Sequence, residues 1–329
     1  MSLKGLRFFK NLKRIYVCDL KLSDMNEISY LTNLETVQFY SCDLGIDDSA
    51  DELKCFTVMK KVDITISDAN LKSIEFLKYF PDLNNCFLEF SMNKISDISI
   101  LSTIENAEVI GLNDNLITDL SPLSNIKNIT YLGFSGNQIL DISPLTNVNI
   151  ECLELSENQI EDINPLLKMK NINELNLSDN QIIDITPLSN LTAITDLDIS
   201  KNLISDITPL KNLVSLKRLR LENNLVRDIS VLSGLKKIDN INLSNNYIMD
   251  PSPIKDIKIG EFNYFQFMNN CILDYSPIQS VLDAKYINSN KYSDRLFYEG
   301  IKWHFDINIK GKDYLENEKE KYTFFIDGD

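Results

Sequence analysis

The pattern of apolar and polar residues repeats along most of this chain with a nearly constant period. In residues 172–191, INELNLSDNQIIDITPLSNL, Ile172, Leu175 and Leu177 lead to Asn180 in the order apolar-x-x-Leu-x-Leu-x-x-Asn. The asparagine recurs at steps of 22, 22, 21, 22, 22 and 22 residues, at Asn115, Asn137, Asn158, Asn180, Asn202, Asn224 and Asn246. A fixed period in this range predicts a solenoid of stacked repeats.

Each repeat predicts a short strand followed by turns. Leu175 and Leu177 alternate with polar residues, which is typical of a half-buried strand. Apolar residues then follow at a spacing of three, which favours short 3₁₀ or helical turns: Ile182, Ile185, Leu188 and Leu191. Pro187 lacks an N–H and has a fixed φ, so it belongs at the start of such a turn. Because one repeat cannot bury both apolar rows, each needs a neighbour on both sides.

The period weakens toward both ends and divides the chain into three parts. The asparagine column continues as Asn270 in one direction and as Asn93, Ala69, Cys42 and Leu20 in the other, for about 12 repeats in total. We expect degenerate repeats with an acidic insertion in residues 1–84 and regular repeats in residues 85–278. Residues 279–329 break the period, which indicates a C-terminal cap or the start of a further domain.

Three details qualify this division. The insertion at Asp47–Glu52 predicts an acidic loop leading into a short helix, since its spacing lacks the alternating ligands of a calcium loop. In the C-terminal part, Trp303–Ile309 and Tyr322–Ile326 alternate like strands. The N-terminal apolar residues match the middle of a repeat, so either an upstream cap and signal were removed or this end tolerates exposure.

Two polar columns predict structural hydrogen bonds. The asparagine amide stands where each strand ends and can satisfy backbone groups of the turn. An aspartate recurs four residues later, at Asp97, Asp119, Asp141, Asp162, Asp184, Asp206, Asp228, Asp250 and Asp274. Each aspartate precedes a turn, and its carboxylate can accept hydrogen bonds from the backbone N–H groups of that turn. We therefore prefer a structural role for these aspartates to a ladder of cation sites.

The runs LNLSDNQIIDITPLSNL (175–191) and LDISKNLISDITPLKNL (197–213) resemble the internalin-type class of leucine-rich repeat proteins. A eukaryotic phosphatase-regulating subunit shares this class. The resemblance covers roughly residues 85–278 and implies an α/β fold. That fold is a right-handed solenoid with a parallel β-sheet on its concave face and short 3₁₀ or helical turns on its convex face. The resemblance also implies non-enzymatic protein recognition, either as a bacterial surface or secreted host-interaction protein or as an intracellular regulatory scaffold.

The concave face carries a non-random order of side chains, because parallel stacking aligns equivalent strand positions. The apolar column consists of Phe87, Val109 and Tyr131, with Gly111 and Gly133 beside it. Glycines weaken strands, so this combination predicts a shallow apolar dish that receives a bulky side chain of a protein partner. The alternative is that these residues are tolerated surface variants or are covered by the chain's own termini.

Next to the apolar column lies the acidic stripe, which consists of Glu154, Glu174, Asp196 and Asp198. Like charges on adjacent strands destabilise a sheet, which indicates a use such as binding basic residues of the partner. Arg218 and Arg220 follow the stripe and are expected either to join the site or simply to neutralise it.

Composition removes several other classes of function. A net charge of −15 argues against nucleic acid and against anionic membrane surfaces as partners. One histidine and no Gly-rich phosphate loop leave no catalytic constellation, metal site or cofactor site, so we expect no enzyme. The six scattered cysteines indicate free thiols and not a disulfide framework.

Two further expectations concern location and a weaker ligand class. No transmembrane run or secretory signal is visible, which indicates a cytoplasmic protein as the sequence stands, or a secreted or surface protein if a signal was removed. Glycan binding through Tyr131, Tyr264 and Asn240–Asn242 is a weaker alternative to a protein partner.

Overall fold

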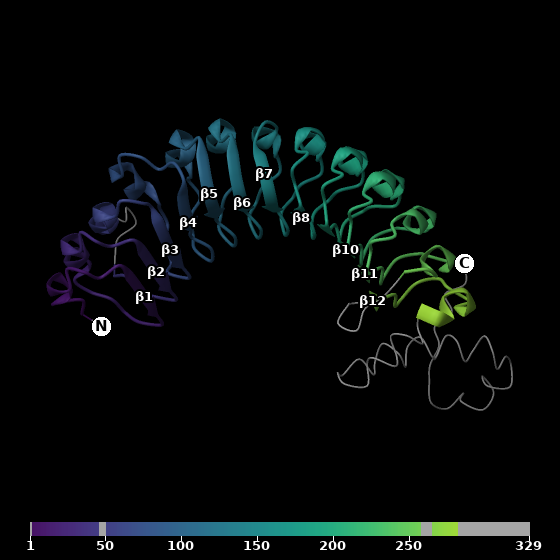
Figure 1. The fold of residues 1–329 in the computed structure, drawn as a ribbon, viewed down its shortest axis with the longest axis horizontal. Coiled ribbons are helices and arrows are strands. Elements are labelled where there is room, and N and C mark those ends of the chain that lie inside the picture. Colours follow the sequence, from purple (N-terminus) through teal and green to yellow (C-terminus); the bar gives the residue numbers. More distant parts are fainter. Residues whose placement is uncertain (1, 46–50, 258–264, 282–329) are drawn as a thin grey trace, which may run out of the picture.

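The computed structural model describes residues 2–45, 51–257 and 265–281 and shows an open arc of stacked repeats (Figure 1). Twelve parallel strands pair in chain order, from β1 to β12, in one sheet. The strands lie on the inner side of the arc, and short 3₁₀ helices lie on its outer side (Figure 1). The predicted solenoid, its concave sheet and its convex turns are confirmed.

The strands are short and evenly distributed along the chain. They are β1 (Arg14–Cys18), β2 (Thr36–Tyr40), β3 (Asp63–Ser67), β4 (Cys86–Glu89), β5 (Asn106–Gly111), β6 (Asn128–Gly133), β7 (Asn149–Glu154), β8 (Glu174–Asn176), β9 (Asp196–Asp198), β10 (Arg218–Arg220), β11 (Asn240–Asn242) and β12 (Phe265–Gln266). Because their backbone groups bond to adjacent repeats, each strand depends on its neighbours and not on the turn of its own repeat.

The convex side consists of 3₁₀ helices, as the spacing of three predicts. They are η1 (Leu6–Phe8), η2 (Met25–Tyr30), η3 (Asp51–Val58), η4 (Glu75–Tyr79), η5 (Ser99–Thr103), η6 (Ser121–Asn125), η7 (Ser143–Leu145), η8 (Asn164–Lys168), η9 (Thr186–Asn190), η10 (Thr208–Asn212), η11 (Ser230–Gly234), η12 (Ser252–Ile254) and η13 (Ser276–Ile278). Proline opens several of them, as at Pro187 in η9.

The asparagine column joins successive repeats. The Nδ2 of Asn180 donates to the carbonyl oxygens of Leu155 (2.9 Å), Leu177 (3.1 Å) and Ser178 (3.2 Å). Its Oδ1 accepts the N–H of Ile160 at 2.9 Å. The structural role predicted for this column is confirmed.

The aspartate column closes the following turn. The Oδ1 of Asp184 accepts the N–H of Thr186 at 2.8 Å, and the same bond to the residue two places later occurs at all nine aspartates. The preferred interpretation of these aspartates as turn-forming residues is confirmed.

A third column was not predicted. The residue before each asparagine-column position has a positive φ, for example Asp179 at 55° and Lys201 at 51°. Aspartate, asparagine and glycine fill many of these positions, and they are the residues that most readily adopt this conformation. That preference was a readable signal in the sequence.

Some predictions concern residues outside the described ranges. They include most of the acidic loop at Asp47–Glu52, the concave position Tyr264 and the strands expected at Trp303–Ile309 and Tyr322–Ile326. The 3₁₀ helix η3 begins at Asp51, as a turn after the insertion predicts. Across the described residues, none of the helices is both long enough and apolar enough to cross a membrane.

Candidate recognition site on the concave face

The sheet aligns the concave side chains in the order that the sequence predicts. Phe87 pairs with Val109, and Val109 pairs with Tyr131 in the next strand. Gly111 pairs with Gly133 in the adjacent column. All three apolar side chains are half-buried, so the apolar column is a contiguous feature of the surface of β4, β5 and β6.

The space above the two glycines is filled by side chains of the chain itself. A Cβ atom added to Gly111 would collide with the carboxylate of Glu89, and one added to Gly133 would lie 2.6 Å from the Tyr131 hydroxyl. That hydroxyl also accepts a hydrogen bond from Asn113 Nδ2 at 3.2 Å. The glycines therefore make room for neighbouring side chains. The surface differs from the expected open dish because Tyr131 and Glu89 fold across it.

The acidic stripe lines a shallow pocket. A cavity of about 110 Å³ is bordered by Glu154, Glu174, Asn176, Asp196, Asp198, Arg218 and Arg220, with Leu175 and Leu197 beneath. The structure thus brings together all six charged residues that the sequence places in the stripe and beside it. Asn176 is an additional member that the charge pattern did not reveal.

The two arginines compensate only part of the stripe. Arg218 forms an ion pair with Asp196, and Arg220 Nη1 lies 3.3 Å from Asp198 Oδ2. The predicted neutralisation is therefore present at β9 and β10. Arg218 and Arg220 are exposed, so these pairs contribute little to stability by themselves.

Glu154 and Glu174 differ from the two aspartates. Glu154 Oε2 accepts a hydrogen bond from Asn176 Nδ2 at 3.1 Å, and Glu174 Oε2 lies 3.9 Å from Cys152 Sγ. Among the described residues, no lysine or arginine forms an ion pair with either glutamate. These two carboxylates give the centre of the concave face an uncompensated negative charge.

Glu222 is a functional candidate that the sequence reasoning missed. It occupies the position that serine fills in the adjacent repeats, at Ser200 and Ser244. Its Oε2 is buried and has no hydrogen-bond partner, and burial raises the pKa of the carboxyl. The departure from the serine column was the signal that could have identified it.

The site offers no activated nucleophile. Burial, followed by the charges of Glu154 and Glu174, raises the pKa of the Cys152 thiol to about 12. A thiol with so high a pKa stays protonated at neutral pH and reacts poorly. In residues 2–45, 51–257 and 265–281, no group of three or more His, Cys, Asp or Glu side chains is placed to hold a metal ion.

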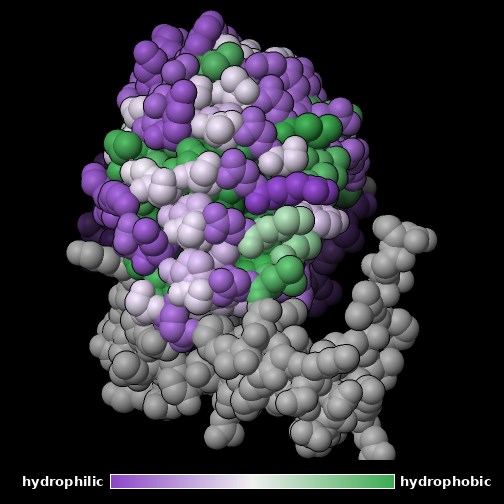
Figure 2. Space-filling view, turned by 90° about the vertical axis from the view of Figure 1, so that its right-hand side faces the viewer, coloured by the Kyte–Doolittle hydropathy of each residue, from purple (hydrophilic) through white to green (hydrophobic). Residues whose placement is uncertain are grey.

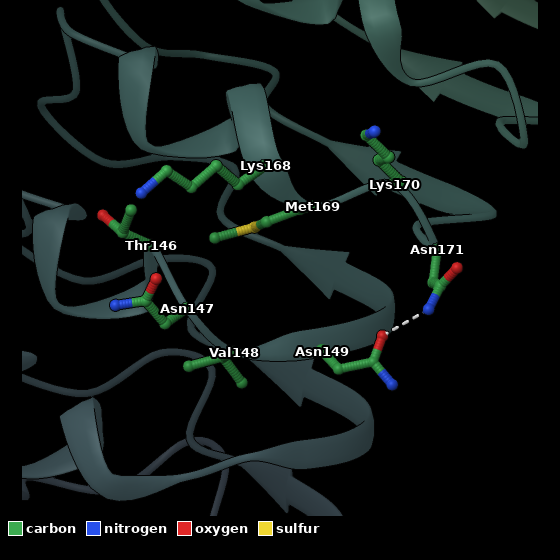
Figure 3. A pocket seen from close by; sticks show the side chains of 8 residues that line it. All are labelled: Thr146, Asn147, Val148, Asn149, Lys168, Met169, Lys170 and Asn171. Atoms are coloured by element: carbon green, nitrogen blue, oxygen red, sulfur yellow. Dashed lines mark hydrogen bonds between the residues drawn. The ribbon is translucent and has the colours of Figure 1, made fainter.

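A second hollow, of about 250 Å³, lies where β7 and β8 begin. Thr146, Asn147, Val148 and Asn149 form one wall, and Lys168, Met169, Lys170 and Asn171 form the other (Figure 3). Asn171 Nδ2 donates to Asn149 Oδ1 at 2.7 Å, whereas the two lysine side chains extend in different directions (Figure 3). The polar groups of this hollow therefore do not converge on one point, in contrast to those of the acidic pocket.

The surface near β12 is different in character. Seen from that end of the arc, the described surface is mostly hydrophilic, with hydrophobic residues in between (Figure 2). The exposed apolar residues there include Met249 and Leu273, which lie in the turns after the strands.

Comparison with known proteins identifies the family. A family model described as "Leucine Rich repeats (2 copies)" matches residues 148–190 and 170–212. Internalin C2 of Listeria monocytogenes is 36% identical over 54% of this chain and 76% of that chain, with a TM-score of 0.50. The chain is a leucine-rich repeat protein, and its repeats are similar to those of the internalins.

Two further structures support the assignment at different levels. Internalin InlF of Listeria monocytogenes is 26% identical to this internalin-like protein over 84% of this chain and 86% of that chain, with a TM-score of 0.63. The plant peptide hormone receptor RGFR1, solved in complex with RGF2, is 20% identical over 81% of this chain and 45% of that chain, with a TM-score of 0.62. At this identity the receptor shares the fold alone. No curated protein sequence matched the chain.

Proposed function

We propose that this internalin-like protein binds a protein partner through the concave face of β4 to β10. Leucine-rich repeat proteins commonly serve as non-enzymatic scaffolds for protein recognition, and the fold presents a curved, ordered sheet for that purpose. The observation that carries the proposal is the acidic pocket, in which Glu154 and Glu174 are not compensated by a cation of the described residues.

The chemistry of the face specifies the kind of partner. A lysine or arginine side chain fits the pocket between Glu154 and Glu174, because a charge-assisted hydrogen bond is stronger than a neutral one. An apolar side chain of the same partner packs on Phe87, Val109 and Tyr131, three strands or fewer from the pocket. Apolar anchor residues beside desolvated charges are typical of binding hot spots in protein interfaces. Arg218 and Arg220 hold Asp196 and Asp198 in place at the border of the pocket.

The first experiment is an affinity pull-down with three purified baits. These are the wild-type chain, the pocket variant Glu154→Gln/Glu174→Gln and a control variant, Glu151→Gln/Glu161→Gln. The control removes the same charge from exposed carboxylates that do not line the acidic pocket. The pocket variant should lose the partner, whereas the control should retain it. Equal retention by all three baits would refute the role of the pocket.

A second variant tests the apolar column. Phe87→Asp/Tyr131→Asp should weaken binding of the captured partner by about tenfold or more, as expected when an apolar anchor is lost. Circular dichroism must show that the variant keeps its fold. Unchanged affinity with an intact fold would remove the apolar column from the site.

We further propose that the partner lies outside the source cell. The chain is more identical to the internalins InlF and InlC2 than to the plant receptor, and resemblance to internalins implies a surface or secreted host-interaction protein. Extract from a candidate host cell surface and lysate of the source cell should therefore be offered to the baits in parallel. A specific partner found only in the source-cell lysate would support an intracellular regulatory scaffold instead. Fractionation of the source cell provides an independent measurement of location.

A further inference from the structure

A strip of exposed apolar side chains runs along the turns that follow β9, β10, β11 and β12. We call it the apolar flank. Its members are Leu203, Leu225, Tyr247, Met249 and Leu273, which are 47%, 41%, 45%, 63% and 78% exposed. In the three preceding repeats, glutamine occupies the position of Leu203, at Gln138, Gln159 and Gln181. A row of exposed apolar residues at positions that are polar elsewhere in the solenoid indicates a binding surface.

Backbone hydrogen bonds hold the apolar flank in register. The N–H of Leu225 donates to the carbonyl oxygen of Ile204 at 2.8 Å, and the N–H of Tyr247 donates to that of Val226 at 2.9 Å. Ile204, Val226 and Ile248 are buried, and the residues on either side of each are exposed. The flank therefore presents its side chains in steps of one repeat, and each step is about 5 Å, the distance between neighbouring strands.

The apolar flank is negatively charged along one border and neutral along the other. Exposed asparagine amides form the neutral border, at Asn223, Asn245 and Asn269. The aspartate column forms the negative border, and each of its carboxylates accepts a turn N–H, at Asp206, Asp228, Asp250 and Asp274. Among the described residues, none of these four carboxylates forms an ion pair. Arg227 is a basic residue within the strip, and its guanidinium lies 5.6 Å from the Tyr247 ring centroid. One guanidinium beside four carboxylates leaves this border negative.

The spacing of the steps decides which kind of segment fits the apolar flank. Successive turns of an α-helix are about 5.4 Å apart, whereas one face of an extended strand presents a side chain about every 6.7 Å. From Leu203 to Leu273 the flank has three steps of about 5 Å, over which a helix drifts out of register by about 1 Å and a strand by about 5 Å. The flank therefore matches the apolar stripe of a helix of about three turns.

We propose that the apolar flank binds an amphipathic helix of a protein partner, with a row of lysine or arginine residues beside the apolar stripe of that helix. The apolar stripe packs on Leu225 and Tyr247, and the basic row lies over the aspartate border. A second copy of the flank would bring one basic side chain and four acidic ones, so it does not supply the complementary charge. This surface is separate from the acidic pocket, which residues of the strands form.

The test uses three synthetic peptides of about 15 residues, which is about four helical turns. The first contains leucine and lysine in the order of an amphipathic helix, the second alternates the same residues, and the third has glutamate in place of lysine in the helical order. Fluorescence anisotropy should show that the purified chain binds the helical leucine–lysine peptide more tightly than either of the others. Circular dichroism should show that this peptide gains helix when it binds.

An apolar variant tests the contact itself. Leu225→Gln/Tyr247→Gln copies the glutamines of the preceding repeats and should raise the Kd of the helical peptide about tenfold, because apolar contact is lost without a change in charge. Leu116→Gln is the matched control, since Leu116 is an exposed residue at the same position of a repeat outside the flank. It should leave the Kd unchanged.

A charge variant tests the aspartate border. Asp228→Asn/Asp250→Asn keeps the oxygen that accepts the turn N–H and should raise the Kd about fivefold and weaken its dependence on salt. The matched control is Asp162→Asn/Asp141→Asn, which removes the same charge from the same turn hydrogen bonds outside the flank. Its Kd should stay close to that of the wild type.

Four outcomes would overturn the proposal. Equal loss of affinity in the variants and their controls means that the peptide follows net charge alone. Tighter binding of the alternating peptide excludes a helix. A peptide that is lost by Glu154→Gln/Glu174→Gln binds the acidic pocket, which overturns this inference and leaves the proposed function of the concave face standing. A wild-type chain that binds none of the peptides leaves the flank to a second copy or to residues 282–329 of the same chain, and sedimentation then distinguishes these two occupants.

Discussion

Replacing Asn180 with alanine should destabilise the protein strongly, because the side chain joins two repeats through four hydrogen bonds. Asn180 Oδ1 is the acceptor of the Ile160 N–H at 2.9 Å, and this donor is buried. The carbonyl oxygens of Leu155 and Leu177 each keep a second asparagine donor, from Asn158 and Asn202. The substitution therefore leaves one buried donor unsatisfied and removes three further bonds.

The magnitude follows from those contacts. A buried donor without an acceptor costs about 1–3 kcal/mol, and each lost bond whose acceptor keeps another donor costs about 0.5–1 kcal/mol. The sum is a loss of about 2.5–6 kcal/mol in the free energy of unfolding. Asn180→Cys should lose less, because the Cys42 thiol in the same column lies 3.3 Å from the carbonyl oxygen of Tyr40. That substitution keeps a weak donor and lacks the acceptor.

Urea unfolding followed by circular dichroism measures the loss. Hydrogen exchange at Ile160 then locates it, since repeat proteins can open locally. Asn173→Ala is the control, because Asn173 is exposed in the same repeat and should change stability by at most about 0.5 kcal/mol. The reasoning is wrong if Asn180→Ala and Asn173→Ala unfold with the same midpoint.

Three further predictions concern the concave face and the turns. Glu222→Ser should stabilise the protein by about 1 kcal/mol at pH 7 and not below about pH 4. The raised pKa means that the wild type loses stability as the pH rises through that carboxyl's range, and urea unfolding at both pH values measures the difference. Gly133→Ala should displace Tyr131 from Asn113 and weaken partner binding without changing any charge, as calorimetry and Tyr131 fluorine labelling would show. Bonds to Thr186 and Thr208 lower the pKa of Asp184 and Asp206, so the stability they provide is present above about pH 4 and lost as the pH falls through the lowered values. Acid unfolding should therefore show the largest difference between wild type and Asp184→Asn/Asp206→Asn near neutral pH and none at the acid end.

The repeating pattern was sufficient to predict the parts of the fold that link equivalent positions of adjacent repeats. The asparagine and aspartate columns are examples, because their partners are backbone groups at fixed distances along the chain. Those partners follow from the period alone once the strands are parallel and in register. The pairing of Phe87 with Val109 and Tyr131 was predictable for the same reason.

The arrangement of side chains on the concave surface was not predictable from the sequence. The glycines at Gly111 and Gly133 predicted an open dish, but Glu89 and Tyr131 rotate into the space that a missing Cβ leaves. The pattern likewise identified the charges of the acidic stripe without showing which of them pair. A side chain at the surface can adopt several rotamers, and contacts with the side chains around it in space decide which rotamer it occupies.

The sequence by itself therefore determined the solenoid, the register of its strands and the identity of the residues on its concave face. A period of about 22 residues sets all three, because it repeats one local solution and stacks it on itself. Only the tertiary structure decided which carboxylates of the acidic stripe lack an ion pair among the described residues, and that the Oε2 atom of Glu222 is buried without a hydrogen-bond partner. These features depend on departures from the repeat, and each departure takes its meaning from the residues that surround it in space.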